Sequence, residues 1–323
     1  MRKISVVMHE DVVLSAVTGA MDLVNGVNDL AGALGMAAPF SIELVGTRFK
    51  NISVSSSVQF LCNKTMADVL NTDLVLIPPF AGDADTILEK HKSIVEWIQV
   101  QNSRKTEWAS LCVGAYFLAE AGLLDNRKAT AHWKAIDHLK VKYPSVDFQP
   151  DKIITDHEGI YTSGGAFSSL NLILYLIEKF CGKEIAIAIS KDFAIEFGRP
   201  SQNYFSIFKG QRRHEDGAIH KAQDYIEKNF LQSLHIDQIA TYCNMSKRNF
   251  IRRFIHSTGL TPLEYIQRLK IESAKKALES TTHPISSVMY DVGYNDSKTF
   301  REVFKKITGL TPQAYQAKYN HLS

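Results

Sequence analysis

Two copies of one hydrophobic pattern lie in the last hundred residues of the chain. The first copy is made of Ile236, Ile239, Cys243, Phe250, Phe254 and the run Gly259-Leu260-Thr261-Pro262. The second copy is made of Ile285, Val288, Val292, Phe300, Phe304 and the run Gly309-Leu310-Thr311-Pro312. The offset is 49 residues at the first three positions and 50 afterwards. A repeat of this kind predicts two helix-turn-helix units whose turns differ by one residue.

In the first unit, residues 236–242 form a short amphipathic pattern and Asn244-Met245 are turn residues. Ser246 is suited to cap the next helix, in which Phe250 and Phe254 face inward. The opposite face carries Arg248 with Arg252 and Asn249 with Arg253, each pair four residues apart. Arginine and asparagine can bond base edges in a DNA major groove, and the remaining cations can bond phosphates.

The second unit follows the same plan with different polar side chains. A supporting helix is expected over 285–292, Gly293-Tyr294-Asn295 form the turn, and Asp296 or Ser297 caps a helix with Phe300 and Phe304 inward. Its candidate DNA-contacting residues are Ser297, Lys298, Thr299, Arg301 and Lys305, and those of the first unit are Lys247, Arg248, Asn249, Arg252 and Arg253. We expect base reading mainly from the first unit and positional anchoring from the second.

A long helix is predicted between the units, beginning at Thr261-Pro262. Ile266, Leu269, Ser273 and Ala277 would give it a narrow apolar stripe. A rigid spacer helix would fix the polar faces of the two helix-turn-helix units relative to each other. Because major grooves on one DNA face recur roughly every 34 Å, such a domain can occupy two successive turns.

Charge supports this interpretation. Residues 217–323 hold 15 Lys and Arg against 9 Asp and Glu, whereas residues 1–216 hold 22 against 25. A solvated basic surface would explain the excess alone, but the cations also lie on the faces opposite the phenylalanines. Double-stranded DNA is the expected partner.

Before residue 200 the pattern is different. Short apolar segments over 4–8, 40–45, 74–78, 107–112 and 159–163 alternate with helical stretches that include 84–101 and 113–121. This alternation predicts a mostly parallel sheet covered by helices on both faces. Cys112 follows one predicted strand directly, at the edge where ligands of such sheets bind and where a helix N-terminus favours thiolate.

Both regions resemble known families. Met245-Ser246-Lys247-Arg248-Asn249-Phe250, the two Gly-Leu-Thr-Pro runs and Asp291-Val292-Gly293-Tyr294-Asn295-Asp296 are similar to the AraC-type DNA-binding domain. Ala109-Ser110-Leu111-Cys112-Val113-Gly114-Ala115, Ala129-Thr130-Ala131-His132-Trp133 and Thr162-Ser163-Gly164-Gly165 resemble the class I glutamine amidotransferase-like (ThiJ/PfpI) domain, in the version found in GlxA-family regulators.

The resemblance implies an α/β flavodoxin-like sensor followed by an all-α, seven-helix AraC-type domain with two helix-turn-helix units. We expect a sensor domain over 1–210, a linker over 211–217 and a DNA-binding domain over 218–323. A homodimer, RNA polymerase as a further partner and a small effector, an amino acid or a quaternary ammonium compound, are also implied. Cys112, Gly82, His132 and Ser163 are the expected effector-binding residues, and Trp133 is either core or a cation-binding ring.

Cys112 is expected to be non-catalytic. Enzymatic relatives place a histidine after the elbow cysteine, where this chain has Val113, and an acidic residue near the first strand, where it has Ala16. A cysteine nucleophile needs a base and an orienting partner, and His132 would serve as base only if folding brought it close. The glycine-rich loop is also altered, to Pro78-Pro79-Phe80-Ala81-Gly82-Asp83.

The sequence thus predicts a DNA-binding transcriptional regulator without enzymatic activity, cofactor or metal. The alternative is a cysteine-dependent amidase-like or aldehyde-handling enzyme tethered to a DNA-binding module. Four widely spaced cysteines fit a reducing cytoplasm. No membrane association is expected, because the uncharged stretch 159–177 contains five Ser, Thr and Asn residues that make it too polar for a span.

Overall fold

The computed structural model describes residues 1–48, 51–55, 58–102, 106–165, 167–198, 201–212 and 214–320. The chain divides into two compact units, Met1–Gln202 and Asn203–Ser323.

A seven-stranded sheet forms the centre of the first unit. Its strand order is β10-β11-β7-β6-β1-β2-β5, and every neighbouring pair is parallel except β10 with β11. The strands are β1 (Arg2–Met8), β2 (Phe40–Gly46), β5 (Lys64–Thr65), β6 (Leu74–Ile77), β7 (Glu107–Ser110), β10 (Ile154–His157) and β11 (Ile160–Ser163). Two small sheets pair β3 (Asn51–Ser55) with β4 (Val58–Leu61) and β8 (Lys128–Ala129) with β9 (Asp147–Phe148).

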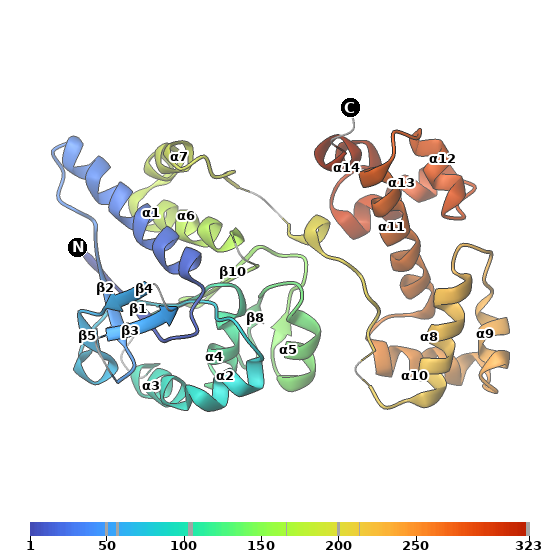
Figure 1. Ribbon diagram of the computed structural model, residues 1–323, viewed down its shortest axis with the longest axis horizontal. Helices are drawn as coiled ribbons and strands as arrows, with labels where there is room; N and C mark the ends of the chain where they lie inside the picture. Colours follow the sequence, from blue (N-terminus) through green and yellow to red (C-terminus); the bar gives the residue numbers. More distant parts are fainter. Residues whose placement is uncertain are drawn as a thin grey trace. The chain divides into compact units, whose positions relative to one another are not determined.

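Helices cover both faces of this sheet, as the sequence predicted (Figure 1). One face carries α1 (Leu14–Ala33), α6 (Ser168–Cys181) and α7 (Lys183–Asp192), and the other carries α2 (Ala84–Lys90), α3 (Lys92–Asn102), α4 (Ala115–Glu120) and α5 (Ile136–Lys142). Two short 3-10 turns, η1 (Met66–Asp68) and η2 (Cys112–Gly114), complete the unit. The central strands read as continuous apolar runs because both of their faces are buried.

The single helix predicted over 84–101 is wrong in one respect, since it is broken at His91 into α2 and α3. The backbone of His91 leaves the helical region, and its ring turns inward to bond Asp11, with 2.7 Å between Nε2 and Oδ2. The helix thus ends where His91 contacts Asp11, 80 residues away in sequence. The local pattern of hydrophobic residues does not reveal such a contact.

The second unit is all helical. Its helices are α8 (Gly217–Asn229), α9 (Ile236–Tyr242), α10 (Lys247–Thr258), α11 (Pro262–Ser280), α12 (Ile285–Asp291), α13 (Ser297–Thr308) and α14 (Pro312–Tyr319), preceded by a 3-10 turn, η3 (Asn203–Phe205). The two predicted helix-turn-helix units are α9 with α10 and α12 with α13. Side chains cap both second helices as expected, Ser246 accepting from the Asn249 N–H and Asp296 from the Thr299 N–H.

The spacer helix α11 forms as predicted, with a capping box between Thr261 and Glu264. Of the stripe predicted for it, Ile266 is buried, and the half-buried Leu269 and Ala277 pack against the first and second hydrophobic cores, while Ser273 is half-buried. The buried face also supplies Tyr265 to the core of the first helix-turn-helix unit. It supplies Ile271, Ala274 and Leu278 to the core of the second. Both hydrophobic cores therefore share this helix.

The predicted domain boundary lies too late in the chain. Residues 203–210, which the sequence assigned to the sensor, belong to the second unit, where the Phe208 ring packs edge-on against Tyr265 at 5.1 Å. The predicted linker over 211–217 also packs on this unit in its described part. Arg212 bonds Asp224 and Glu227, and Asp216 caps α8, while Arg213 lies outside the described residues.

Within the described ranges, no helix combines the length and the apolar character that crossing a bilayer requires.

Candidate functional site

A sharp elbow follows strand β7 in the first unit. Cys112 takes the left-handed backbone conformation, with φ of 57°, and is 6% exposed. Its N–H donates to Ser163 Oγ at 3.3 Å, and that hydroxyl donates to the Ser110 carbonyl at 3.4 Å. Gly114 is required here, since a Cβ at this position would lie 2.4 Å from the Ile77 carbonyl oxygen. The turn is therefore fixed on both sides by neighbouring strands.

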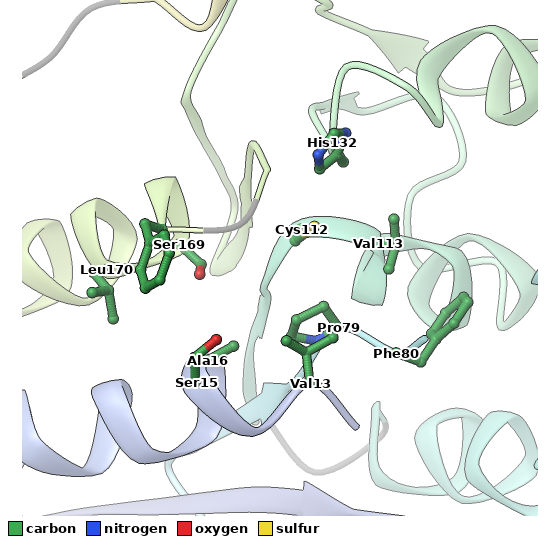
Figure 2. Close-up of a pocket in the computed structure, with 11 residues that line it drawn as sticks. Val13, Ser15, Ala16, Pro79, Phe80, Cys112, Val113, His132, Ser169 and Leu170 are labelled. Atoms are coloured by element: carbon green, nitrogen blue, oxygen red, sulfur yellow. The ribbon is translucent and has the colours of Figure 1, made fainter. Parts of the chain in front are cut away.

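The elbow opens into a cavity of about 250 Å³ (Figure 2). First-turn residues of α1 and α6 lie across from Cys112 and Val113, with His132 on a loop at another side. The full lining is Val13, Ser15, Ala16, Pro79, Phe80, Cys112, Val113, His132, Phe167, Ser169 and Leu170. This lining is mostly apolar, and the described residues in it include no Asp, Glu, Lys or Arg. Such a cavity suits a small ligand that is held largely by shape.

His132 is held as a hydrogen-bond donor. Its Nδ1 accepts from the Lys134 N–H at 3.1 Å. Burial, and to a smaller extent the Lys134 charge, lower the pKa of the imidazole below its usual value. The neutral tautomer that this bond requires carries its proton on Nε2. The ring therefore offers an N–H on the side away from Lys134, which suits binding of a ligand acceptor better than abstraction of a proton.

The two substitutions that argued against catalysis lie in the cavity itself. Ala16 and Val113 both line it together with the Cys112 thiol. A carboxylate at the first position and an imidazole at the second would lie within the same small space. The methyl and isopropyl groups found there provide neither a base nor an orienting partner for a thiol nucleophile.

The other predicted ligand residues lie outside the lining. Ser163 is fully buried beneath the elbow, where it holds the Cys112 N–H. Gly82 has φ of 120° and faces Ile87. The Trp133 ring is 5.3 Å from Lys134 Nζ rather than part of the cavity wall. Of the four expected effector-binding residues, the structure thus brings Cys112 and His132 together in the lining, places Ser163 beneath the elbow and leaves Gly82 outside the lining.

Sequence reasoning missed most of the apolar wall. Val13 and Ser15 begin α1, Pro79 and Phe80 follow β6, and Phe167, Ser169 and Leu170 begin α6. All these segments meet at the edge where the parallel strands end. The rule that ligands bind at this edge pointed to the region, but it did not say which side chains face inward.

A histidine cluster at the end of β1 was also missed. His9, Asp11 and His91 each place one potential ligand atom within 4.8 Å of the others. Asp11 Oδ2 already bonds His91 Nε2 and Lys90 Nζ, both at 2.7 Å, and the Asp11 N–H donates to His9 Nδ1. Burial and the nearby His91 lower the pKa of His9 to about 3, so its ring is neutral. The Asp11 carboxylate therefore already has hydrogen-bond partners within the chain.

In the second unit, α10 presents most of its predicted polar face to solvent. Lys247, Arg248 and Arg252 are exposed, and Asn249 is half-buried. Asn249 Oδ1 accepts from Arg252 Nη2 at 3.1 Å, which orients both side chains on one face. Lys247 pairs with Asp237 at 3.0 Å, an exposed contact that contributes little by itself. Phe250 and Phe254 are fully buried on the opposite face, as predicted.

Arg253 requires a correction, because it does not extend freely from the outer face. Its guanidinium forms two bonds with Asp216, from Nε to Oδ2 at 2.9 Å and from Nη2 to Oδ1 at 2.7 Å. Asp216 also accepts from the Ala218 and Ile219 N–H groups at the start of α8. The Arg253 bond and these backbone donors hold the pKa of Asp216 below its usual value. Spacing on one helix could not show a partner 37 residues earlier in the chain.

The corresponding helix α13 exposes all five predicted residues, Ser297, Lys298, Thr299, Arg301 and Lys305. The Thr299 hydroxyl donates to Asp296 Oδ1 at 2.6 Å and so takes part in the helix cap. Three cations therefore remain as the main polar feature of this face. The difference in chemistry between α10 and α13 that the sequence indicated persists in the structure.

Comparison with known proteins matches both units. The DJ-1/PfpI family model covers residues 3–179, and a helix-turn-helix domain model covers residues 239–318. The HTH-type transcriptional regulator GbdR of Pseudomonas aeruginosa is 24% identical over 242 residues, which are 75% of this chain and 65% of GbdR. The HTH-type transcriptional regulator GlxA of Rhizobium meliloti is 26% identical over 204 residues, 62% of this chain and 61% of GlxA.

Solved structures agree on the fold of the first unit. A crystal structure of an AraC family transcriptional regulator from Pseudomonas putida superposes with a TM-score of 0.53 at 16% identity, over 60% of this chain and all of that one. Drosophila melanogaster DJ-1beta gives 0.50 at 18% identity, over 61% of this chain and 99% of that one. These likenesses show the fold, and the family model over more than half of the residues shows that the chain belongs to the DJ-1/PfpI family, here joined to a helix-turn-helix domain.

Proposed function

We propose that this protein is a sequence-specific DNA-binding transcriptional regulator whose DJ-1/PfpI unit senses a small metabolite without turning it over. The observation that carries the proposal is the pair of helices α10 and α13. Each buries two phenylalanines on one face and presents cations on the other, and α11 packs into the cores of both. GbdR and GlxA, which share both regions, are themselves named HTH-type transcriptional regulators.

The two helices have different tasks in this proposal. Arg248 and Arg252 with Asn249 form a hydrogen-bonding face suited to base edges in a major groove. Lys298, Arg301 and Lys305 are suited to phosphates, which position a protein without reading sequence. Specificity therefore comes mainly from α10 and anchoring from α13. A homodimer in the cytoplasm, with RNA polymerase as a further partner, completes the proposal.

The cavity at Cys112 is the proposed effector site. Its size admits a metabolite such as an amino acid or a quaternary ammonium compound, and His132, which lines it, can donate from Nε2 to an acceptor on such a ligand. The apolar side chains of Ala16 and Val113 favour ligand binding over catalysis. With them, the described residues that line the cavity around the Cys112 thiol include no carboxylate.

The DNA-contacting faces are tested by alanine variants on a duplex selected from random sequence by the wild-type protein. Arg248→Ala should cost about 1–3 kcal/mol of binding, because it removes a base contact. Lys298→Ala should weaken binding evenly across sequences and reduce the salt slope by about 0.9, the value for one phosphate contact. Lys228→Ala, an exposed cation on α8, is the matched control. Wild-type affinity in both test variants would refute the assignment.

Arg253 is expected to stabilise the unit rather than contact DNA. Asp216→Asn keeps a residue that caps helices well but removes the charge that holds the guanidinium. This variant and Arg253→Ala should both melt at a lower temperature than Arg248→Ala in a circular dichroism scan. Their salt slopes for DNA binding should equal that of the wild type. A slope lower by about 0.9 in Arg253→Ala would instead show a phosphate contact and restore the original assignment.

The effector site is tested by a thermal-shift screen of the full chain against amino acids and betaines. A ligand at one hundred times its dissociation constant stabilises the native state by about 2.7 kcal/mol. Ala16→Phe should abolish the shift, because the added ring fills the cavity that Ala16 lines. A hit whose shift persists in Ala16→Phe binds elsewhere and contradicts the assignment of this cavity.

A further inference from the structure

Gln202, the last residue of the first unit, has a buried side chain surrounded by backbone carbonyls. It is 1% exposed. Its Nε2 lies 3.0 Å from the Ala131 carbonyl oxygen, 3.1 Å from that of Lys152 and 3.2 Å from that of Pro150. Its Oε1 accepts from the Gly165 N–H at 3.4 Å. An amide so enclosed costs free energy if its partners move away, because its polar atoms have no access to water.

These partners belong to segments that form the cavity wall. Ala131 immediately precedes His132, and Gly165 lies two residues before Phe167. The two glycines here permit the close packing. A Cβ at Gly164 would lie 2.7 Å from Gln202 Oε1, and one at Gly165 would lie 2.3 Å from His132 Cδ2. A ligand that displaces His132 or the start of α6 must therefore disturb the environment of Gln202.

The chain that follows Gln202 is attached to the second unit. We call residues 203–216 the connector, of which Arg213 is not described. The nearly buried Lys275 of α11 donates from Nζ to the Ser206 carbonyl, and the Phe208 ring packs on Tyr265 of the same helix. At its far end, Asp216 holds Arg253 of α10 through the two bonds given above. The connector thus contacts both the shared helix and the first recognition helix.

From this arrangement we infer that Gln202 is the positioning residue through which occupancy of the cavity acts on the DNA-binding unit. Three residues separate it from Ser206, so a shift of Gln202 is passed to a segment fastened to α11 and α10. The inference rests on the proposed function and names the regulation of its effector site. A ligand acts in this way only if it binds one arrangement of Gln202 and the connector more tightly than another.

Iodoacetamide serves as the probe, so that the test does not depend on knowing the natural effector. It alkylates the Cys112 sulfur with loss of iodide and leaves a carbamidomethyl group inside the cavity. Hydrogen–deuterium exchange of the full chain, read by mass spectrometry, then reports the connector amides and those of α10. Peptide mapping locates the modified cysteine. The Cys112→Ser variant, treated in the same way, shows any effect of alkylation at the other three cysteines.

In the wild type, alkylation should change exchange in the connector by about fivefold or more, the lower range of typical coupling between sites. Gln202→Met keeps the side-chain length but loses the amide. This variant should still be alkylated at Cys112, but its connector should not change exchange. Gln101→Met is the matched control, because it removes another buried amide of the first unit, bonded to the Val69 carbonyl at 2.9 Å. The response should persist in this control.

Two results would overturn the inference: a wild-type connector that does not respond to alkylation, or a response that survives in Gln202→Met. If Gln202→Met does not fold, as judged by its melting curve, Gln202→Asn shortens the amide and should reduce the response in the same direction. DNA affinity is measured separately on the unmodified proteins. If the exchange response fails while the wild type still binds DNA, only the positioning role of Gln202 is refuted. If the wild type does not bind DNA, the proposed function is refuted.

Discussion

The sharing of α11 between two hydrophobic cores is the constraint on which the DNA-binding unit depends. Tyr265 and Ile266 are buried with the phenylalanines of α10, and Ile271, Ala274 and Leu278 are buried with those of α13. Neither helix-turn-helix unit can rotate about α11 without exposing part of its own core. Two small cores, each marginal alone, thus gain a fixed spacing. A fixed spacing is what the proposed binding to two successive grooves of DNA requires.

The sequence predicted this unit well because its signals are local. Repeated phenylalanines, cap residues at 246 and 296 and the Gly-Leu-Thr-Pro runs each determine structure within a few residues. The errors involve distant contacts. The bond between His91 and Asp11 breaks a helix, Asp216 engages Arg253, and Phe208 moves the domain boundary. In the first unit, the sheet edge and Cys112 were predictable, whereas the apolar wall depends on how separate helices begin against one another.

The cavity combines a sharp elbow with a mostly apolar lining. The strained turn at Cys112 and the tight packing at Gly114 form this elbow. Ala16 and Val113 lie in the lining at the positions where the resemblance implied an acidic residue and a histidine, and His132 Nδ1 accepts from the Lys134 N–H. An elbow geometry that can position a nucleophile can equally hold a ligand, because both tasks need a preformed pocket at a strand end. In the proposed regulation, the buried Gln202 beside this pocket gives ligand binding a route to the connector.

Hydroxyl-radical footprinting of the full chain on a selected duplex tests the central claim most directly. If α10 and α13 enter successive major grooves, each bound DNA-binding unit should protect two patches on one face of the duplex, about one helical turn or 34 Å apart. Arg248→Ala should weaken one of these patches and Lys298→Ala the other. Protection of a single groove segment per unit, or protection that both variants leave unchanged, would contradict the account of a two-groove reader built on α11.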